Sequence, residues 1–279
     1  MRRRASPQGR HRMNTMLLHF ISLPSSAQIA LWAASGCACA ALVHLLLRKL
    51  APDHVTQKQS DEVGVIIAVV GIFYGLIIAA LLVRAINHFD ASSDIVEREA
   101  ELAGSLYRMS AQGLPSARQP VKDNLLAYLD AVVSREWPLQ QKGEEVPANS
   151  PELGRLSRAL AAVRPAERRE AEYLSLAQHQ LNGLYASRHA RLSDQAMTIP
   201  LDIWWVSLIG EVLLIFFAWL MHVPSKAVHF FLTCAMAASI SIVLAIILIY
   251  DTPFYGDISV SPEPYRKTLR AIRADSLDG

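Results

Sequence analysis

The chain has 279 residues, 52% of them hydrophobic, and a formal net charge of only +2. This apolar content is high for a water-soluble protein, so we expect a membrane protein. The small net charge argues against a nucleic-acid-binding protein, because such proteins carry a basic surface for the phosphate backbone.

Four apolar runs are predicted to cross the membrane as helices. Each is close to the roughly 20 residues that a helix needs to span the hydrocarbon core. The spans are residues 29–47, 63–83, 203–221 and 228–250. They separate an N-terminal tail (1–28), two outer loops (48–62 and 222–227), a large segment (84–199) and a C-terminal tail (251–279).

Basic residues predict the orientation of the chain. Arginines are concentrated in the N-terminal tail, in residues 84–199 and after the last span, and Arg188 and Arg191 near the third span are among them. The two outer loops contain few basic residues. Because positive residues near spans stay on the inner side, we expect both termini to be cytoplasmic. The predicted location is the cell membrane, which in a bacterium is the inner membrane.

The second span is predicted to continue as one helix beyond the membrane, until Gly113 and Pro115 stop it. When successive residues are placed 100° apart, Gly71, Gly75 and Ala79 form a stripe of small residues. Small residues let another helix approach closely, so we expect this stripe to face the rest of the protein.

The opposite side of the same helix carries Ile66, Phe73 and Ile77, followed by Arg84. Two interpretations fit this line. In one, the apolar residues face lipid and the arginine reaches toward the headgroups. In the other, several copies of the helix surround an axis, so that the apolar residues form a neck and Arg84 forms a positive ring that favours anions.

Residues 84–199 are predicted to form a helical domain, because apolar residues recur there at helical spacing and no strand-like alternation is present. One helix is expected to end at Trp137 and Pro138. Ser150 is expected to cap the next helix, which has Pro151 at its first position. The apolar stripes of such helices need partners, so a bundle is the expected arrangement.

Glu211 is a carboxylate deep inside the third span, and Tyr74 and Ser241 lie at nearly the same depth in the second and fourth spans. We expect these side chains to form an intramembrane polar layer, because an ionised carboxylate is costly in lipid. The layer either joins the helices by hydrogen bonds or belongs to a proton or ion relay.

No motif for enzymatic chemistry is present: the chain lacks HExxH, GxSxG, a phosphate-binding loop and paired ExxH motifs. The histidines are scattered. Cys37, Cys39 and Cys234 lie inside apolar runs, where thiols usually pack as small hydrophobic groups. We therefore expect a protein that is not an enzyme and that uses no metal and no cofactor.

Three segments carry a resemblance to a known family. The second span leading into FDASSDIVEREAELAGSLYRMSAQGLP, the later AYLDAVVSREWP and the segment DTPFYGDISVSPEP are similar to the bacterial bestrophin-like family of unknown function. The resemblance covers roughly Ile29 to Arg270. It implies two spans on either side of a cytoplasmic helical insert, as the topology above predicts.

What the resemblance implies about function comes from a distant similarity of this family to the bestrophins. Bestrophins are pentameric anion channels whose second span lines the pore, which points here to Ile66, Phe73 and Ile77. No clear match to the acidic calcium-binding cluster of animal bestrophins is present. We expect an all-α, four-span protein that contacts the lipid bilayer, forms a homo-oligomer and acts as an ion channel for anions. The alternative is a membrane-anchored scaffold or sensor whose helical domain binds a cytoplasmic protein.

Overall fold

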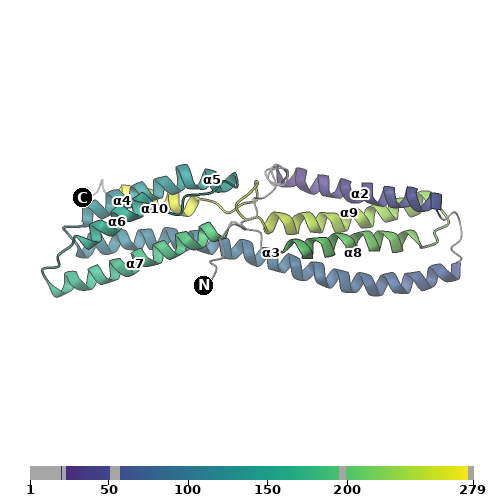
Figure 1. Ribbon diagram of the computed structural model, residues 1–279, viewed down its shortest axis with the longest axis horizontal. Coiled ribbons are helices and arrows are strands. Elements are labelled where there is room, and N and C mark those ends of the chain that lie inside the picture. Colours follow the sequence, from purple (N-terminus) through teal and green to yellow (C-terminus); the bar gives the residue numbers. More distant parts are fainter. Residues whose placement is uncertain (1–19, 21–22, 51–56, 195–198, 276–279) are drawn as a thin grey trace, which may run out of the picture.

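The computed structural model describes residues 20, 23–50, 57–194 and 199–275, and every regular element within these ranges is helical. The elements are α2 (Ser25–Leu50), α3 (Gln57–Gly113), α4 (Arg118–Ala131), the π-helical turn η1 (Val132–Glu136), α5 (Trp137–Gln141), α6 (Pro151–Ala161), α7 (Arg168–Ser193), α8 (Leu201–Trp219), α9 (Lys226–Tyr250) and α10 (Glu263–Ala274). The molecule is elongated, with one helical bundle at each end (Figure 1). This confirms the predicted all-α fold class.

Helix α3 runs through both bundles (Figure 1). It is a single helix of 57 residues, because its sequence contains no proline and stays apolar or amphipathic throughout. It ends at Gly113, as predicted from the sequence. A Cβ atom at Gly113 would overlap the ring of Tyr173 on α7, so a glycine there lets these two helices approach closely.

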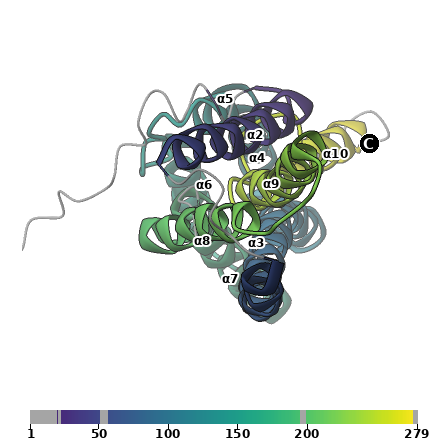
Figure 2. The same ribbon diagram turned by 90° about the vertical axis from the view of Figure 1, so that its right-hand side faces the viewer.

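The membrane bundle consists of α2, α8, α9 and the first half of α3. These four helices are long and apolar enough to cross a membrane, which confirms the four predicted spans. Helix α2 lies against α9, where a Cβ atom at Gly36 would overlap the hydroxyl of Ser241. Seen from its end, the group carries α3 at its edge, where α3 packs on α8 and α9 (Figure 2).

The insert bundle consists of α4, η1, α5, α6, α7, α10 and the second half of α3. Its core contains mainly leucine, valine, alanine and aromatic side chains, and every one of these elements contributes to it. Ser150 caps α6 as predicted, because its hydroxyl accepts a hydrogen bond of 3.3 Å from the backbone of Leu153. The C-terminal segment 251–275 is not a free tail. Its helix α10 is amphipathic and buries Tyr265, Leu269 and Ile272 in the bundle.

The boundaries of several predicted segments differ in the structure. Helix α2 begins four residues before the predicted first span, and both α2 and α3 extend into the predicted outer loop 48–62. Residues 51–56 of that loop, most of the N-terminal tail 1–28 and the last four residues lie outside the described ranges.

The prediction that one helix ends at Trp137 and Pro138 is wrong. The helix continues to Gln141 after the wide turn η1, in which the backbone N–H of Trp137 bonds to the carbonyl oxygen of Val132, five residues earlier. Pro138 is the second residue of α5, and because proline has no backbone N–H, the helical hydrogen-bond ladder lacks one donor directly after the wide turn.

Candidate functional site

The line of pore-lining candidates on α3 is exposed along the whole membrane bundle. Ile66, Phe73 and Ile77 have exposed fractions of 49%, 64% and 46%. Arg84 is also exposed and lies at the end of the line nearest the insert bundle. At 100° a residue, all four side chains leave the helix within about 20° of one direction. A single copy of the chain thus presents an apolar strip that ends in a positive charge.

The stripe of Gly71, Gly75 and Ala79 does not pack against any other described part of the chain, contrary to the expectation from sequence. A Cβ atom at either glycine would meet no atom within 4 Å, and Ala79 is exposed. The buried face instead contains Tyr74 and Ile78, about a quarter turn away. One physical reason is the Tyr74 hydroxyl, which needs a hydrogen-bond partner within the membrane and finds it in the Ser207 carbonyl oxygen on α8.

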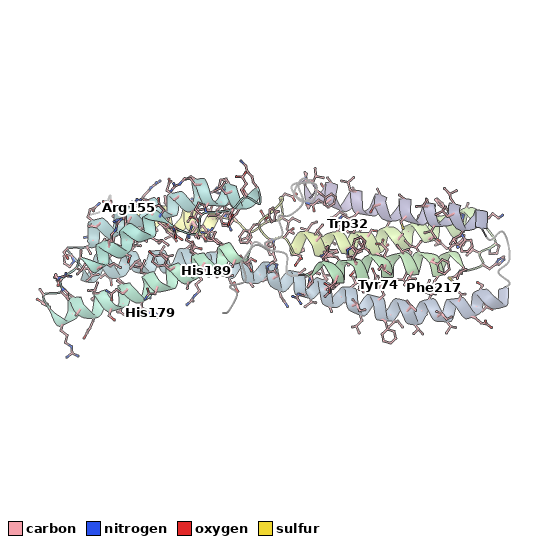
Figure 3. The ribbon with its side chains drawn as sticks, viewed as in Figure 1. Trp32, Tyr74, Arg155, His179, His189 and Phe217 are labelled. Carbon is pink, nitrogen blue, oxygen red and sulfur yellow. The ribbon has the colours of Figure 1, made fainter. Side chains whose placement is uncertain are left out.

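The predicted polar layer is divided between two contacts. The Ser241 hydroxyl on α9 donates a hydrogen bond to the Glu211 carboxylate on α8, and both side chains are buried. Tyr74 lies between α3 and α8 and donates instead to the carbonyl oxygen of Ser207 at 2.8 Å, one turn from Glu211 (Figure 3). Its ring occupies the space beside Gly210, where a Cβ atom would overlap it. These contacts join three helices, and the relay stays a prediction.

A buried network of charged side chains lies in the insert bundle. Arg191 on α7 has a fully buried side chain and binds Glu99 on α3, with Nε 2.8 Å from Oε2 and Nη2 3.1 Å from Oε1. Its Nη2 also lies 2.7 Å from Oε2 of Glu136 on η1, and its Nη1 bonds to Gln140 on α5. One guanidinium group thus joins four elements.

Glu99 is surrounded by two more donors. The phenol of Tyr128 on α4 bonds to Oε1, and the phenol of Tyr265 on α10 lies 3.0 Å from Oε2. Burial raises the pKa of both phenols well above its ordinary value, and the charge of Glu99 raises it further. Both phenols therefore stay protonated and act as donors to the carboxylate.

Glu136 binds a second arginine at the edge of the network. Nη2 of Arg188 lies 2.8 Å from Oε1 of Glu136, and the same guanidinium group donates to the carbonyl oxygens of Pro147 and Ala148 at 2.8 and 2.6 Å. Two arginines and two glutamates balance each other in charge. The wide turn η1 contributes Glu136, and single π-helical turns within α-helices frequently occur at functional sites.

Within the described ranges, no group of three histidine, cysteine, aspartate or glutamate side chains is arranged to hold a metal ion.

The match to known families decides where the protein belongs. The model of the bestrophin-like domain matches residues 36–265, which is most of the chain. The chain belongs to the bestrophin-like family. With its four apolar helices, it is a membrane protein related to bestrophin channels. Searches of curated proteins and of solved structures found no match.

The charged network of this bestrophin-like protein is the part of the site that sequence analysis missed. Arg188 and Arg191 are counted there as positive charges near a membrane span, whereas the structure buries both and pairs them. The signal was present in the spacing. With Leu181 and Leu184, the two arginines follow the i, i+3, i+7, i+10 pattern of the buried face of α7.

Proposed function

We propose that this bestrophin-like protein is an oligomeric ion channel for anions in the cell membrane, and not an enzyme. In this proposal, the membrane halves of α3 from several copies surround the pore, and the insert bundle lies in the cytoplasm. The observation that carries the proposal is the exposed apolar strip of Ile66, Phe73 and Ile77, which ends at Arg84.

The position of α3 supports this arrangement. It lies at the edge of the membrane bundle, so its exposed side is accessible to another copy of the chain (Figure 2). On the opposite side of α3 from the strip, Gly75 and Ala79 form a surface of small residues that no described residue covers. A helix of a neighbouring copy can approach closely at that surface, as small residues permit in membrane helix pairs.

Arg84 gives the proposed pore its selectivity for anions. An arginine stays protonated at any physiological pH, so each copy adds one positive charge to a ring at the pore mouth. At a dielectric constant of about 80, a unit charge about 8 Å from a pore ion contributes about 0.5 kcal/mol. Reversing the charge in several copies therefore changes the energy of an anion in the pore by more than about 1.4 kcal/mol, which corresponds to a tenfold change in its occupancy.

The test is chloride flux from liposomes that contain the purified protein. We expect flux from the wild type and a loss of about tenfold or more in Arg84→Glu. Lys142→Glu is the matched control, because Lys142 is exposed in the insert bundle and the net charge changes equally. Liposomes that remain tight to chloride with wild-type protein would refute the channel.

The mass of the detergent-solubilised particle tests the assembly separately. We expect a multiple of the chain mass for the wild type and a smaller particle for Gly75→Leu. The thermal stability of Gly75→Leu should be close to that of a wild-type monomer, because a Cβ atom at Gly75 would meet no described atom of its own chain within 4 Å. A monomeric wild type would contradict the proposal and favour the scaffold or sensor alternative, since a monomer cannot surround an axis.

A further inference from the structure

His88 lies where the two bundles meet. It is near the middle of α3, and its side chain is 93% buried. Two helices end beside it: α7 of the insert bundle, with Asp194 as its C-cap, and α9 of the membrane bundle, with Asp251 as its C-cap. At the same place, the ring of Phe89 on α3 contacts the ring of Tyr250 at the end of α9.

The imidazole of His88 stands between the two carboxylates. Its Nε2 lies 3.4 Å from Oδ1 of Asp194, and its Nδ1 lies 3.9 Å from Oδ1 of Asp251. Neither ring nitrogen makes a hydrogen bond of good geometry to a described residue, although both are buried. Ser92, one turn further along α3, bonds to the other oxygen of Asp194, and the backbone N–H of Ile199 lies 3.3 Å from Oδ2 of Asp251.

The electrostatic surroundings of this imidazole are negative. The C-terminal end of a helix carries a partial negative charge, and here the ends of α7 and α9 converge with a carboxylate at each. Among the described residues, Asp194 and Asp251 are the side chains within ion-pair distance of His88. Arg84 on α3 and Asp202 on α8 have exposed side chains. A positive charge on the ring is therefore attracted by both helix ends.

We propose that His88 is a proton-binding latch between the membrane bundle and the insert bundle. When the ring carries a second proton, both nitrogens donate, one to each carboxylate, and α3 holds the ends of α7 and α9 together. When the ring loses that proton, one carboxylate loses its donor and the two negative groups repel each other. The latch is closed when the ring is doubly protonated, at acidic pH, and open when the ring is neutral.

The latch does not depend on channel activity, so its test measures the coupling of the two bundles and not flux. Hydrogen–deuterium exchange of the full chain in detergent reports the end of α7, with rates corrected for the intrinsic effect of pH. We expect protection of residues 188–194 to fall about tenfold or more between pH 5.5 and 7.5 in the wild type. In His88→Gln, which cannot titrate, protection should be the same at both pH values.

Two further variants and one additive make the outcome unambiguous. His189→Gln is the matched control, because His189 lies on the exposed side of α7, and it should behave as the wild type. Asp194→Asn removes one carboxylate without touching the ring and should weaken the pH dependence even if His88→Gln folds poorly. Protection that is independent of pH in the wild type, or a pH dependence that persists in His88→Gln, would overturn the latch. Protection that chelators abolish would overturn it as well, because the site would then hold a metal ion.

Discussion

Replacing Arg191 with methionine tests the buried charged network directly. Methionine keeps an unbranched apolar side chain in the core of the insert bundle but removes the charge that Glu99 and Glu136 share. The Glu99 side chain is fully buried, so it cannot regain water without opening the bundle. Removing one partner of a buried ion pair costs about 3–5 kcal/mol. In a protein of this size 1 kcal/mol shifts Tm by about 2–4 °C, so the expected loss is about 6–20 °C.

The assay is thermal unfolding in detergent at a fixed heating rate, since membrane proteins often unfold irreversibly. Fluorescence of Trp137 is one reporter, because its ring contacts Phe254 and Tyr265 inside the insert bundle. Arg168→Met is the matched control. The side chain of Arg168 is 94% exposed, and an exposed pair such as the one it forms with Glu172 contributes at most about 1 kcal/mol.

A double variant separates the loss of charge from the loss of packing. In Glu99→Gln combined with Arg191→Met, the uncompensated carboxylate is gone, so Tm should recover part of the loss seen in Arg191→Met alone. A Tm of Arg191→Met within about 2 °C of the wild type would refute the reasoning. A double variant no more stable than the single one would show that packing, and not charge, accounts for the effect.

Two further predictions concern single carboxylates. Burial raises the pKa of Glu152, but hydrogen bonds from its own backbone N–H, Arg135 and Ser150 outweigh it, so the net pKa is lowered. The ionised Glu152 therefore stabilises the fold at pH values above its unfolded pKa of about 4.3, and this stabilisation is lost as the pH falls through the lower pKa of the folded state. The Tm difference between the wild type and Glu152→Gln should accordingly shrink on acidification toward pH 3. A constant difference would contradict this. In the membrane bundle, Glu211→Gln should keep the bond with Ser241, whereas Glu211→Ala should cost about 1–3 kcal/mol, measured as Tm in detergent. Equal losses in the two variants would count against a hydrogen-bonding role.

The spans and the long helix were predictable because they depend on properties of the chain that can be read locally. The length of an apolar run decides whether it can cross a membrane, and α3 contains no proline that would interrupt it. The helical periodicity of residues 84–199 likewise predicted helices. The N-terminal cap of α6 could likewise be predicted from a single residue, Ser150.

The rotation of α3 was not predictable, because it depends on which neighbours compete for its faces. The small residues around Gly75 and the larger ones around Tyr74 are both reasonable packing faces when the helix is considered alone. The charged network was missed for a similar reason. Glu99 and Arg191 are 92 residues apart in the sequence, and nothing near either of them indicates the partner.

Because α3 is one continuous helix, it connects the two ends of the molecule rigidly. At the usual rise of about 1.5 Å per residue, its 57 residues measure about 85 Å. A tilt of about 5° about its midpoint displaces each end sideways by about 4 Å. A displacement of its half in the insert bundle is therefore transmitted directly to its half in the membrane bundle, because no break in the helix separates them.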